Sequence, residues 1–220
     1  MPKLSICIPT YNRGNLLKKC LESIEVSLKG HNWVEVCISD NASNDNTLSV
    51  INDFRARLPI IFLTNSKNIG LSQNILHVTS MANGDYIWLV GDDDYLLPNS
   101  LDIIHKIMHD KQNIDVDFFY NNAYKTKNLD TLTSKPMHLE DHDLEKTFLN
   151  KQNQKINFLQ LIDYDLSWDF LGAIYMSIFH AATWRKGLAN IDEQELIRPG
   201  TFSSLENTFI HLKVFPNAFC

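Results

Sequence analysis

DYIWLVGDDDYLLP (residues 85–98) places three consecutive aspartates after a run that is apolar on both faces. Such a run is typical of a strand buried on both sides, as in a parallel sheet. Asp92, Asp93 and Asp94 repel one another, and no cationic residue lies nearby in the sequence. Mg²⁺ or Mn²⁺ would compensate them, because both prefer carboxylate oxygens and take only one or two from protein. The stretch predicts a divalent-cation site after a buried strand; the alternative is a solvated acidic turn before a helix at Asn99.

The segments on either side of this stretch alternate between strand and helix patterns. Strands are expected over residues 4–9, 34–39, 59–64, 85–90 and 116–121. Helices are expected over 15–24, 70–82 and 99–110, and in one further segment that carries Leu48, Ile51 and Phe54 at helical spacing. On the helix over 70–82, the expected buried side chains are Leu71, Ile75, Val78 and Ala82. Alternation of this kind indicates βαβ units, so we predict an α/β fold with a mostly parallel central sheet flanked by helices.

The second half of the chain has a different pattern. Residues 121–167 are polar and irregular until 156–162, whereas 168–184 are apolar and suit a buried strand followed by a helix. Another helix is expected over 206–215, after which the chain stops without an evident closing element. We therefore expect residues 1–120 and 121–220 to be two halves of one domain, truncated at the C-terminus.

Composition excludes several classes of protein. The 220 residues are 44% hydrophobic and carry a formal net charge of −6, which argues against a general nucleic-acid binder. No apolar run approaches the roughly 18–20 residues of a membrane span. The four cysteines show no CxxC spacing, which indicates reduced core thiols in a cytoplasmic protein.

Polar residues follow three of the predicted strands. Pro9-Thr10-Tyr11-Asn12-Arg13 ends the first strand, residues 40–43 end the second, and residues 91–94 end the fourth. Ligands bind beyond the carboxyl ends of the strands in parallel α/β sheets. These segments are therefore expected to meet at one ligand site, with Arg13 either reaching a phosphate or remaining an ordinary solvated charge.

Four motifs give the chain a family resemblance: PTYNR (9–13), EVCISDNASNDNT (35–47), NIGLSQN (68–74) and DYIWLVGDDDYLLP (85–98). In this order and spacing they resemble family 2 glycosyltransferases of the GT-A fold. The metal motif is similar to that of abequosyltransferase-like enzymes, which build bacterial surface polysaccharide. The resemblance implies that residues 1–120 bind a nucleotide-sugar and that 121–220 face the acceptor.

The resemblance also implies roles for single residues in nucleotide binding. Tyr11 would stack on the base, Asp40 would bind its polar edge, and Asp92 would meet the ribose. The further implied positions are Pro9 and Thr10 in the wall of the base site, Asn41 where many members have a second aspartate, and Gly70 and Asn74 where a turn and helix close over the nucleotide. The alternatives are a surface aromatic for Tyr11 and a helix cap for Asp40.

The metal ligand and the catalytic base follow from the same resemblance. Asp93 matches the metal-binding aspartate, but Gly91 stands where many members have the first acid of Asp-x-Asp. Either the carboxylate pair has shifted to Asp92 and Asp94, or Asp93 and the diphosphate hold the cation without a second aspartate. Asp93 and Asp94 are the predicted metal ligands. Glu206 is the predicted catalytic base, with Asp169, Asp192 and Glu193 as rivals.

The resemblance implies an inverting, metal-dependent transfer of a sugar from a nucleotide-diphosphate donor to an acceptor hydroxyl. The expected cofactor is Mn²⁺ or Mg²⁺, and the expected acceptor is a saccharide, free or lipid-linked, in polysaccharide or lipopolysaccharide biosynthesis. The protein is expected in the cytoplasm, at the inner face of the membrane if it associates peripherally. The alternatives are an inactive nucleotide-sugar-binding module and a nucleotidyltransferase.

Overall fold

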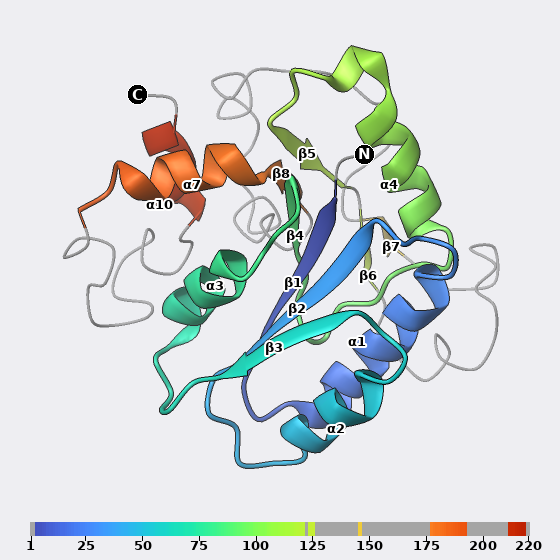
Figure 1. Cartoon of the computed structure of the whole chain (residues 1–220), viewed down its shortest axis with the longest axis vertical. Coiled ribbons are helices and arrows are strands. Elements are labelled where there is room, and N and C mark those ends of the chain that lie inside the picture. The colour runs from blue at the N-terminus through green and yellow to red at the C-terminus, as the bar shows by residue number, and fades with distance from the viewer. Residues whose placement is uncertain (1–2, 122, 126–144, 147–176, 193–210, 219–220) are drawn as a thin grey trace.

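The computed structural model describes residues 3–121, 123–125, 145–146, 177–192 and 211–218. Its centre is a six-stranded sheet with helices on both faces (Figure 1). In spatial order the strands are β3 (Ile60–Thr64), β2 (Val34–Asp40), β1 (Leu4–Thr10), β4 (Tyr86–Leu89), β8 (Ser177–His180) and β5 (Phe118–Tyr120). A separate two-stranded sheet pairs β6 (Tyr124–Lys125) with β7 (Glu145–Lys146).

The main sheet is mostly parallel, as predicted. β1 pairs in parallel with β2 and β4, and β2 pairs in parallel with β3. β8 is antiparallel to both of its neighbours, β4 and β5. The carboxyl ends of β1, β2, β3 and β4 therefore meet at one edge, where the register places Thr10 opposite Asp40 and Asp40 opposite Thr64.

Two hydrophobic clusters hold the helices against the sheet. Strand residues alternate between the faces, so Ile6 and Ile8 pack on one side while Cys7 packs on the other. The first face is covered by α1 (Gly14–Ser27), α2 (Thr47–Phe54) and α4 (Ser100–His109). The second face is covered by α3 (Leu71–Ser80), α7 (Ala181–Ala189) and α10 (His211–Ala218). A short 3-10 helix, Lys111–Asn113, follows α4.

Most predicted elements are confirmed, with ends that differ by a few residues. Two side chains were assigned to the wrong face: Leu48 is 47% exposed and Leu71 is 39% exposed. In α2 the buried stripe is Val50, Ile51 and Phe54, so Leu48 faces outward. Leu71 is the first residue of α3 and lies at the rim rather than over the core.

The remaining sequence expectations have mixed outcomes. Cys7, Cys20 and Cys37 are free and buried, as predicted. The strand and helix expected within 168–184 correspond to β8 and the start of α7, and the helix expected over 206–215 corresponds to α10 from His211 onward. None of the described helices is long and apolar enough to cross a membrane.

Candidate functional site

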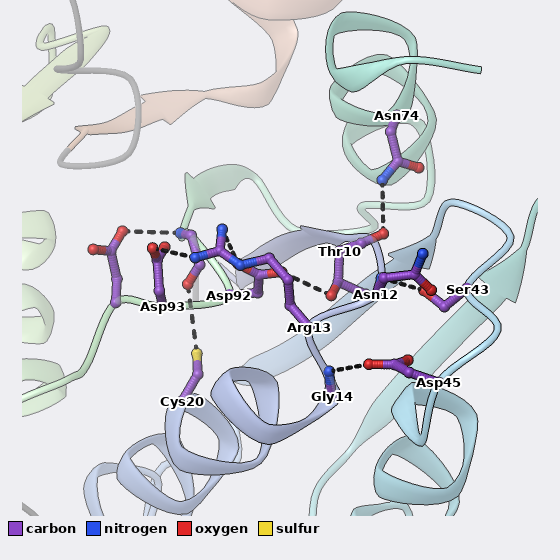
Figure 2. A network of polar contacts seen from close by, with 12 residues as sticks. Thr10, Asn12, Arg13, Gly14, Cys20, Ser43, Asp45, Asn74, Asp92 and Asp93 are labelled. Atoms are coloured by element: carbon purple, nitrogen blue, oxygen red, sulfur yellow. Dashed lines mark hydrogen bonds and ion pairs between the residues drawn. The ribbon is translucent and has the colours of Figure 1, made fainter. Parts of the chain in front are cut away.

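A polar network at the carboxyl edge of the sheet joins the segments that follow β1 and β4 (Figure 2). Thr10, the last residue of β1, donates a hydrogen bond from Oγ1 to Oδ2 of Asp92 at 2.8 Å. Both residues are buried, and Asp92 is only 4% exposed. A buried carboxylate needs such partners, because its charge has lost the solvation that water provides.

Arg13 supplies the positive charge beside the aspartates. Its Nη1 lies 3.0 Å from Oδ1 of Asp92, and its Nη2 lies 2.6 Å from Oδ2 of Asp93. The sequence expectation that no cationic residue compensates these charges is therefore wrong. The pairing joins residues about 80 positions apart, which proximity in sequence does not indicate.

The three consecutive aspartates have different surroundings. Burial raises the pKa of Asp92, although the hydrogen bond from Thr10 and the charge of Arg13 act in the opposite direction. Oδ2 of Asp94 accepts a hydrogen bond from the Gly91 N–H at 3.0 Å. Although the Asp94 residue as a whole is exposed, desolvation of its carboxylate, with the nearby charges of Asp93 and Asp92, raises the pKa of Asp94 to about 6.

Gly91 makes room for two of these carboxylates. A Cβ atom at position 91 would lie 2.8 Å from Oδ2 of Asp94 and 3.0 Å from Oδ1 of Asp93. Both oxygens therefore converge on the space that a side chain at position 91 would fill. A longer side chain at position 91, where many family members have the first acid of Asp-x-Asp, would therefore meet both carboxylates.

The turn after β1 is fastened to the loop after β2. Asn12 has a left-handed φ of 52°; its N–H donates to Oγ of Ser43 at 2.8 Å, and its Oδ1 accepts from the Asn44 N–H at 2.8 Å. The Gly14 N–H donates to Oδ2 of Asp45 at 2.9 Å. Tyr11, in the middle of this turn, is 41% exposed at the sheet edge. The network thus presents an aromatic side chain to solvent from a fixed backbone.

Asp40 ends β2 and is buried. Its Oδ1 accepts a hydrogen bond from the Ser43 N–H at 3.1 Å, which stabilises the turn through Ala42 with its positive φ of 64°. It does not cap α2: the Thr47 N–H at the start of that helix donates to Asp45 instead. The helix-cap alternative for Asp40 is therefore wrong, and a base-binding role stays a prediction.

An asparagine network lies behind the edge, between the strands and α3. Oδ1 of buried Asn74 accepts from Ser39 Oγ at 2.7 Å and from Asn65 Nδ2 at 3.0 Å, and its amide donates to the Ser39 carbonyl at 3.0 Å. Asn41 accepts from Asn65 and from the Ile69 N–H. The network therefore connects the ends of β2 and β3 with the start of α3.

Gly70 links this network to the helix start. It has a positive φ of 84° and precedes α3, and its carbonyl accepts from the Asn74 N–H at 3.1 Å. Its N–H donates to Oδ1 of Asn68, which also accepts from the Asn41 amide. Gly70 and Asn74 thus hold the turn and helix start together, and contact with a nucleotide stays a prediction for both.

The described structure brings together most predicted site residues at one edge: Pro9, Thr10, Tyr11, Arg13, Asp40, Asn41, Gly70, Asn74, Asp92, Asp93 and Asp94. Glu206, Asp169 and Glu193 lie outside the described residues, whereas Asp192 is exposed, three residues beyond the end of α7. Asp45 and Asn65 were not predicted from the sequence. Asp45 had a usable signal, since an aspartate commonly accepts a hydrogen bond from the backbone N–H two residues further on.

The donor set suits a hard cation that is shared with a ligand. Within the described part of the chain, no group of three or more His, Cys, Asp or Glu side chains is arranged to hold a metal ion. Mg²⁺ and Mn²⁺ need fewer, because phosphate and water oxygens complete their coordination. The converging oxygens of Asp93 and Asp94 beside Gly91 fit this requirement.

The parallel sheet, with its acidic and aromatic residues gathered at the carboxyl edge, defines the GT-A class of α/β proteins. The glycosyl transferase family 2 model matches residues 5–167, and the chain belongs to this family. Members of this family generally depend on a divalent metal.

Curated relatives support this assignment. Over 113 residues the chain is 43% identical to abequosyltransferase RfbV of Salmonella typhimurium. The aligned region covers 50% of this chain and 34% of the relative. The chain is 34% identical over 103 residues to the GalNAc(5)-diNAcBac-PP-undecaprenol beta-1,3-glucosyltransferase of Campylobacter jejuni, covering 46% and 33% of the two chains. The chain thus spans about a third of the length of these relatives.

A solved structure shares the fold. Residues 1–349 of TarS from S. aureus superpose with a TM-score of 0.69 at 19% identity, covering 98% of this chain and 56% of that one. The superposition covers nearly the whole chain. Because the sequence identity is low, it shows that the two proteins share a fold.

Proposed function

We propose that the protein transfers a sugar from a nucleotide-diphosphate donor to an acceptor hydroxyl, with inversion at the anomeric carbon. The observation that carries this proposal is the set of Asp93 and Asp94 oxygens beside Gly91, at the same sheet edge as Tyr11 and Asp40. An aromatic face, a base-binding carboxylate and hard oxygen donors are the groups that a nucleotide-diphosphate requires. Family membership and the abequosyltransferase relative support it.

In this proposal the donor lies across the ends of β1, β2 and β4. Tyr11 stacks on the base, Asp40 accepts a hydrogen bond from the base edge, and Asp92 orients the ribose. Pro9 and Thr10 shape the wall, while Asn41, Gly70 and Asn74 hold the turn that closes over the nucleotide. Residues 1–120 thus bind the donor and residues 121–220 face the acceptor.

Asp93 and Asp94 are the residues proposed to hold Mn²⁺ or Mg²⁺. When bound, the cation neutralises the charge that develops on the leaving diphosphate. Glu206 is proposed to accept the proton of the acceptor hydroxyl as that oxygen attacks the anomeric carbon from the face opposite the diphosphate. The acceptor oxygen displaces the diphosphate directly and its proton moves to a carboxylate oxygen, so no covalent enzyme intermediate is required.

The proposed acceptor is a saccharide, free or lipid-linked, in bacterial surface polysaccharide synthesis. The Campylobacter jejuni relative supports a lipid-linked acceptor, because its name gives an undecaprenol-linked saccharide. Transfer from a cytoplasmic nucleotide-sugar to a lipid-linked acceptor would take place at the inner face of the membrane, where the protein would associate peripherally.

Nucleotide titration tests the donor site. UDP, GDP, CDP and dTDP are titrated by calorimetry with and without Mn²⁺, using wild type, Asp93→Ala and the control Asp53→Ala, whose carboxylate is exposed on α2. We expect one nucleotide to bind in a Mn²⁺-dependent manner and Asp93→Ala to weaken it at least about tenfold, or roughly 1.4 kcal/mol. Equal binding by all three proteins in Mn²⁺ would contradict the metal assignment.

A second measurement tests the base. Glu206→Gln should keep the nucleotide affinity of the wild type but abolish sugar transfer, because the amide cannot accept the proton. Retained turnover would assign the role to another carboxylate, and Asp192→Asn is the variant to measure next. Donor binding without transfer by the wild type, across saccharide acceptors, would instead favour a binding module.

A further inference from the structure

We propose that Arg13 is an exchangeable counter-ion: it neutralises the aspartates without ligand, yields their oxygens to the divalent cation, and then pairs with the diphosphate. The inference rests on the proposed function, and it adds a positioning role that couples metal binding to nucleotide binding. Its basis is the fork that Arg13 forms across two neighbouring carboxylates.

The guanidinium pairs with one of the two carboxylates proposed to hold the cation, and with its neighbour Asp92. Nη2 of Arg13 lies 2.6 Å from Oδ2 of Asp93, the predicted metal ligand, and Nη1 lies 3.0 Å from Oδ1 of Asp92. A planar guanidinium with two donors toward two acids is the geometry that gives strong charge-assisted bonds. Binding of a cation through both oxygens of Asp93 requires that Arg13 withdraw, and binding through Oδ1 alone is opposed by the charge of the neighbouring guanidinium.

The two carboxylates differ in how easily they exchange. Asp92 is buried and keeps the Thr10 hydroxyl as a second partner, whereas the Asp93 side chain is 49% exposed. An exposed ion pair contributes little to stability, commonly less than about 1 kcal/mol. The Arg13–Asp93 contact is thus the weaker arm of the fork, and it is the arm that lies on the metal ligand.

The backbone of Arg13 is anchored by hydrogen bonds, whereas its side chain is partly exposed. The Arg13 carbonyl accepts from the Leu16 and Leu17 N–H groups at the start of α1, and Asn12 and Gly14 are bound to the 43–45 loop. The side chain itself is 43% exposed and runs from this anchored turn toward Asp92 and Asp93 (Figure 2). Its four rotatable bonds let the guanidinium change partners without movement of the site.

The charges at the site indicate which group Arg13 pairs with after it leaves the aspartates. A nucleotide diphosphate brings negative charge to an edge that already carries three aspartates, and a divalent cation offsets only part of it. Arginine binds phosphate oxygens with the same two-donor fork that it offers to carboxylates. The displaced guanidinium therefore has a matching anion within reach when the donor arrives.

Metal binding without nucleotide tests the first step. Binding of Mn²⁺ alone is measured by electron paramagnetic resonance for wild type, Arg13→Gln, Arg13→Lys and the control Lys18→Gln, which removes an exposed charge from the same region of α1. We expect Arg13→Gln to bind Mn²⁺ about tenfold more tightly than wild type, because no guanidinium competes for the carboxylates. Lys18→Gln should stay within about twofold of wild type, because its charge is exposed and screened.

The second step has its own measurement. At saturating Mn²⁺, Arg13→Gln should bind the preferred nucleoside diphosphate about tenfold more weakly than wild type, because the phosphate partner is lost. Arg13→Lys should show smaller changes in both Mn²⁺ affinity and nucleotide affinity, since a lysine ammonium keeps the positive charge but lacks the two parallel N–H donors of arginine. It also serves as the deciding variant if Arg13→Gln fails to fold, as judged by its melting curve.

The outcomes separate the two proposals. Unchanged or weaker Mn²⁺ binding in Arg13→Gln relative to Lys18→Gln would overturn the exchange, as would unchanged nucleotide affinity. If no nucleoside diphosphate binds the wild type, the proposed function fails, and the exchange, which requires a diphosphate partner, fails with it. If the wild type binds one but the Arg13 variants behave like the control, only the exchange fails.

Discussion

The hydroxyl of Thr10 lies 2.8 Å from Oδ2 of Asp92 and joins the carboxyl end of β1 to the segment after β4, across 82 positions of sequence. On its other oxygen, Asp92 contacts Arg13. The carboxylate is thus oriented by one neutral and one charged partner, from the same turn. Loss of either partner leaves this buried carboxylate with one partner, which makes its burial more costly.

Thr10→Val should destabilise the protein. Valine keeps the shape of threonine and suits a strand, but it leaves the buried Asp92 without its hydroxyl donor. Hydrogen bonds to charged groups contribute about 1.5–3 kcal/mol, and we expect a loss of that size in the free energy of unfolding. Urea denaturation at neutral pH measures it. Thr10→Ser, which restores the hydroxyl donor, should recover most of the lost stability. Equal stability of Thr10→Val and the wild type would contradict a stabilising role for the Thr10 hydroxyl.

Gly91→Ala should disturb the Asp93 and Asp94 carboxylates. The added Cβ would lie 2.8 Å from Oδ2 of Asp94, so that side chain must move away from the Gly91 N–H. Because this carboxylate is the end of a flexible, exposed side chain, the cost is mainly that of the lost hydrogen bond, about 0.5–1.5 kcal/mol. A double-mutant cycle in urea denaturation tests it: Gly91→Ala should cost less in an Asp94→Ala background, because the clash is gone. Equal costs in both backgrounds would show that the carboxylate is not the obstacle.

Protonation of Asp94 should make stability depend on pH. The pKa of this carboxyl is raised from 3.8 to about 6, so the folded state binds the proton more tightly than the unfolded state. The resulting stabilisation is fully present below about pH 4 and is lost as the pH rises through about 6. Relative to Asp94→Asn, the wild type should therefore lose stability over this range, as measured by thermal melts. A parallel pH profile of the two proteins would contradict the shift.

The same titration should affect metal binding. Carboxylates bind a cation in their deprotonated form, so Mn²⁺ affinity of the wild type should rise as the pH passes about 6. Asp94→Asn should bind Mn²⁺ more weakly and show less of this rise. A flat wild-type profile between about pH 5 and 7, measured by electron paramagnetic resonance, would argue against Asp94 as a ligand.

Asn74→Ala should loosen the connection between α3 and the strands. The Asn74 side chain is buried and bonds Ser39 and Asn65, so alanine leaves several buried polar groups without partners. We expect a loss of roughly 2–4 kcal/mol, since each unsatisfied buried group costs about 1–3 kcal/mol. Urea denaturation measures this, with the neighbouring, less buried Gln73→Ala as control. Equal effects of the two substitutions would contradict a connecting role for Asn74.

Much of the fold could be predicted because local patterns determine it. The segments that become β1 to β4 are short apolar runs, and the helices between them show apolar residues at helical spacing. Their alternation fixes a parallel sheet, and a parallel sheet brings the strand ends to one edge. The meeting of Thr10, Asp40 and Asp92 was therefore predictable from topology alone.

The partners within that edge were not predictable. Arg13 reaches Asp92 and Asp93 from a turn in which Asn12 adopts a left-handed φ and is held by Ser43. Nothing in the local sequence indicates which carboxylates a long, flexible side chain selects. The asparagine network has the same difficulty, since an amide both donates and accepts, and its partner depends on backbone placement within a few tenths of an ångström.

The place of β8 between β4 and β5 has a consequence for synthesis of the chain. Among the described strands, β5 pairs with β8 and with no other. As the chain leaves the ribosome, β1 to β4 can pair early, but β5 has no partner in the sheet until residues 177–180 emerge. At about 5–20 residues per second, this delay lasts about 3–12 s, during which the aromatic residues Phe118 and Phe119 stay open to chaperones and to other nascent chains.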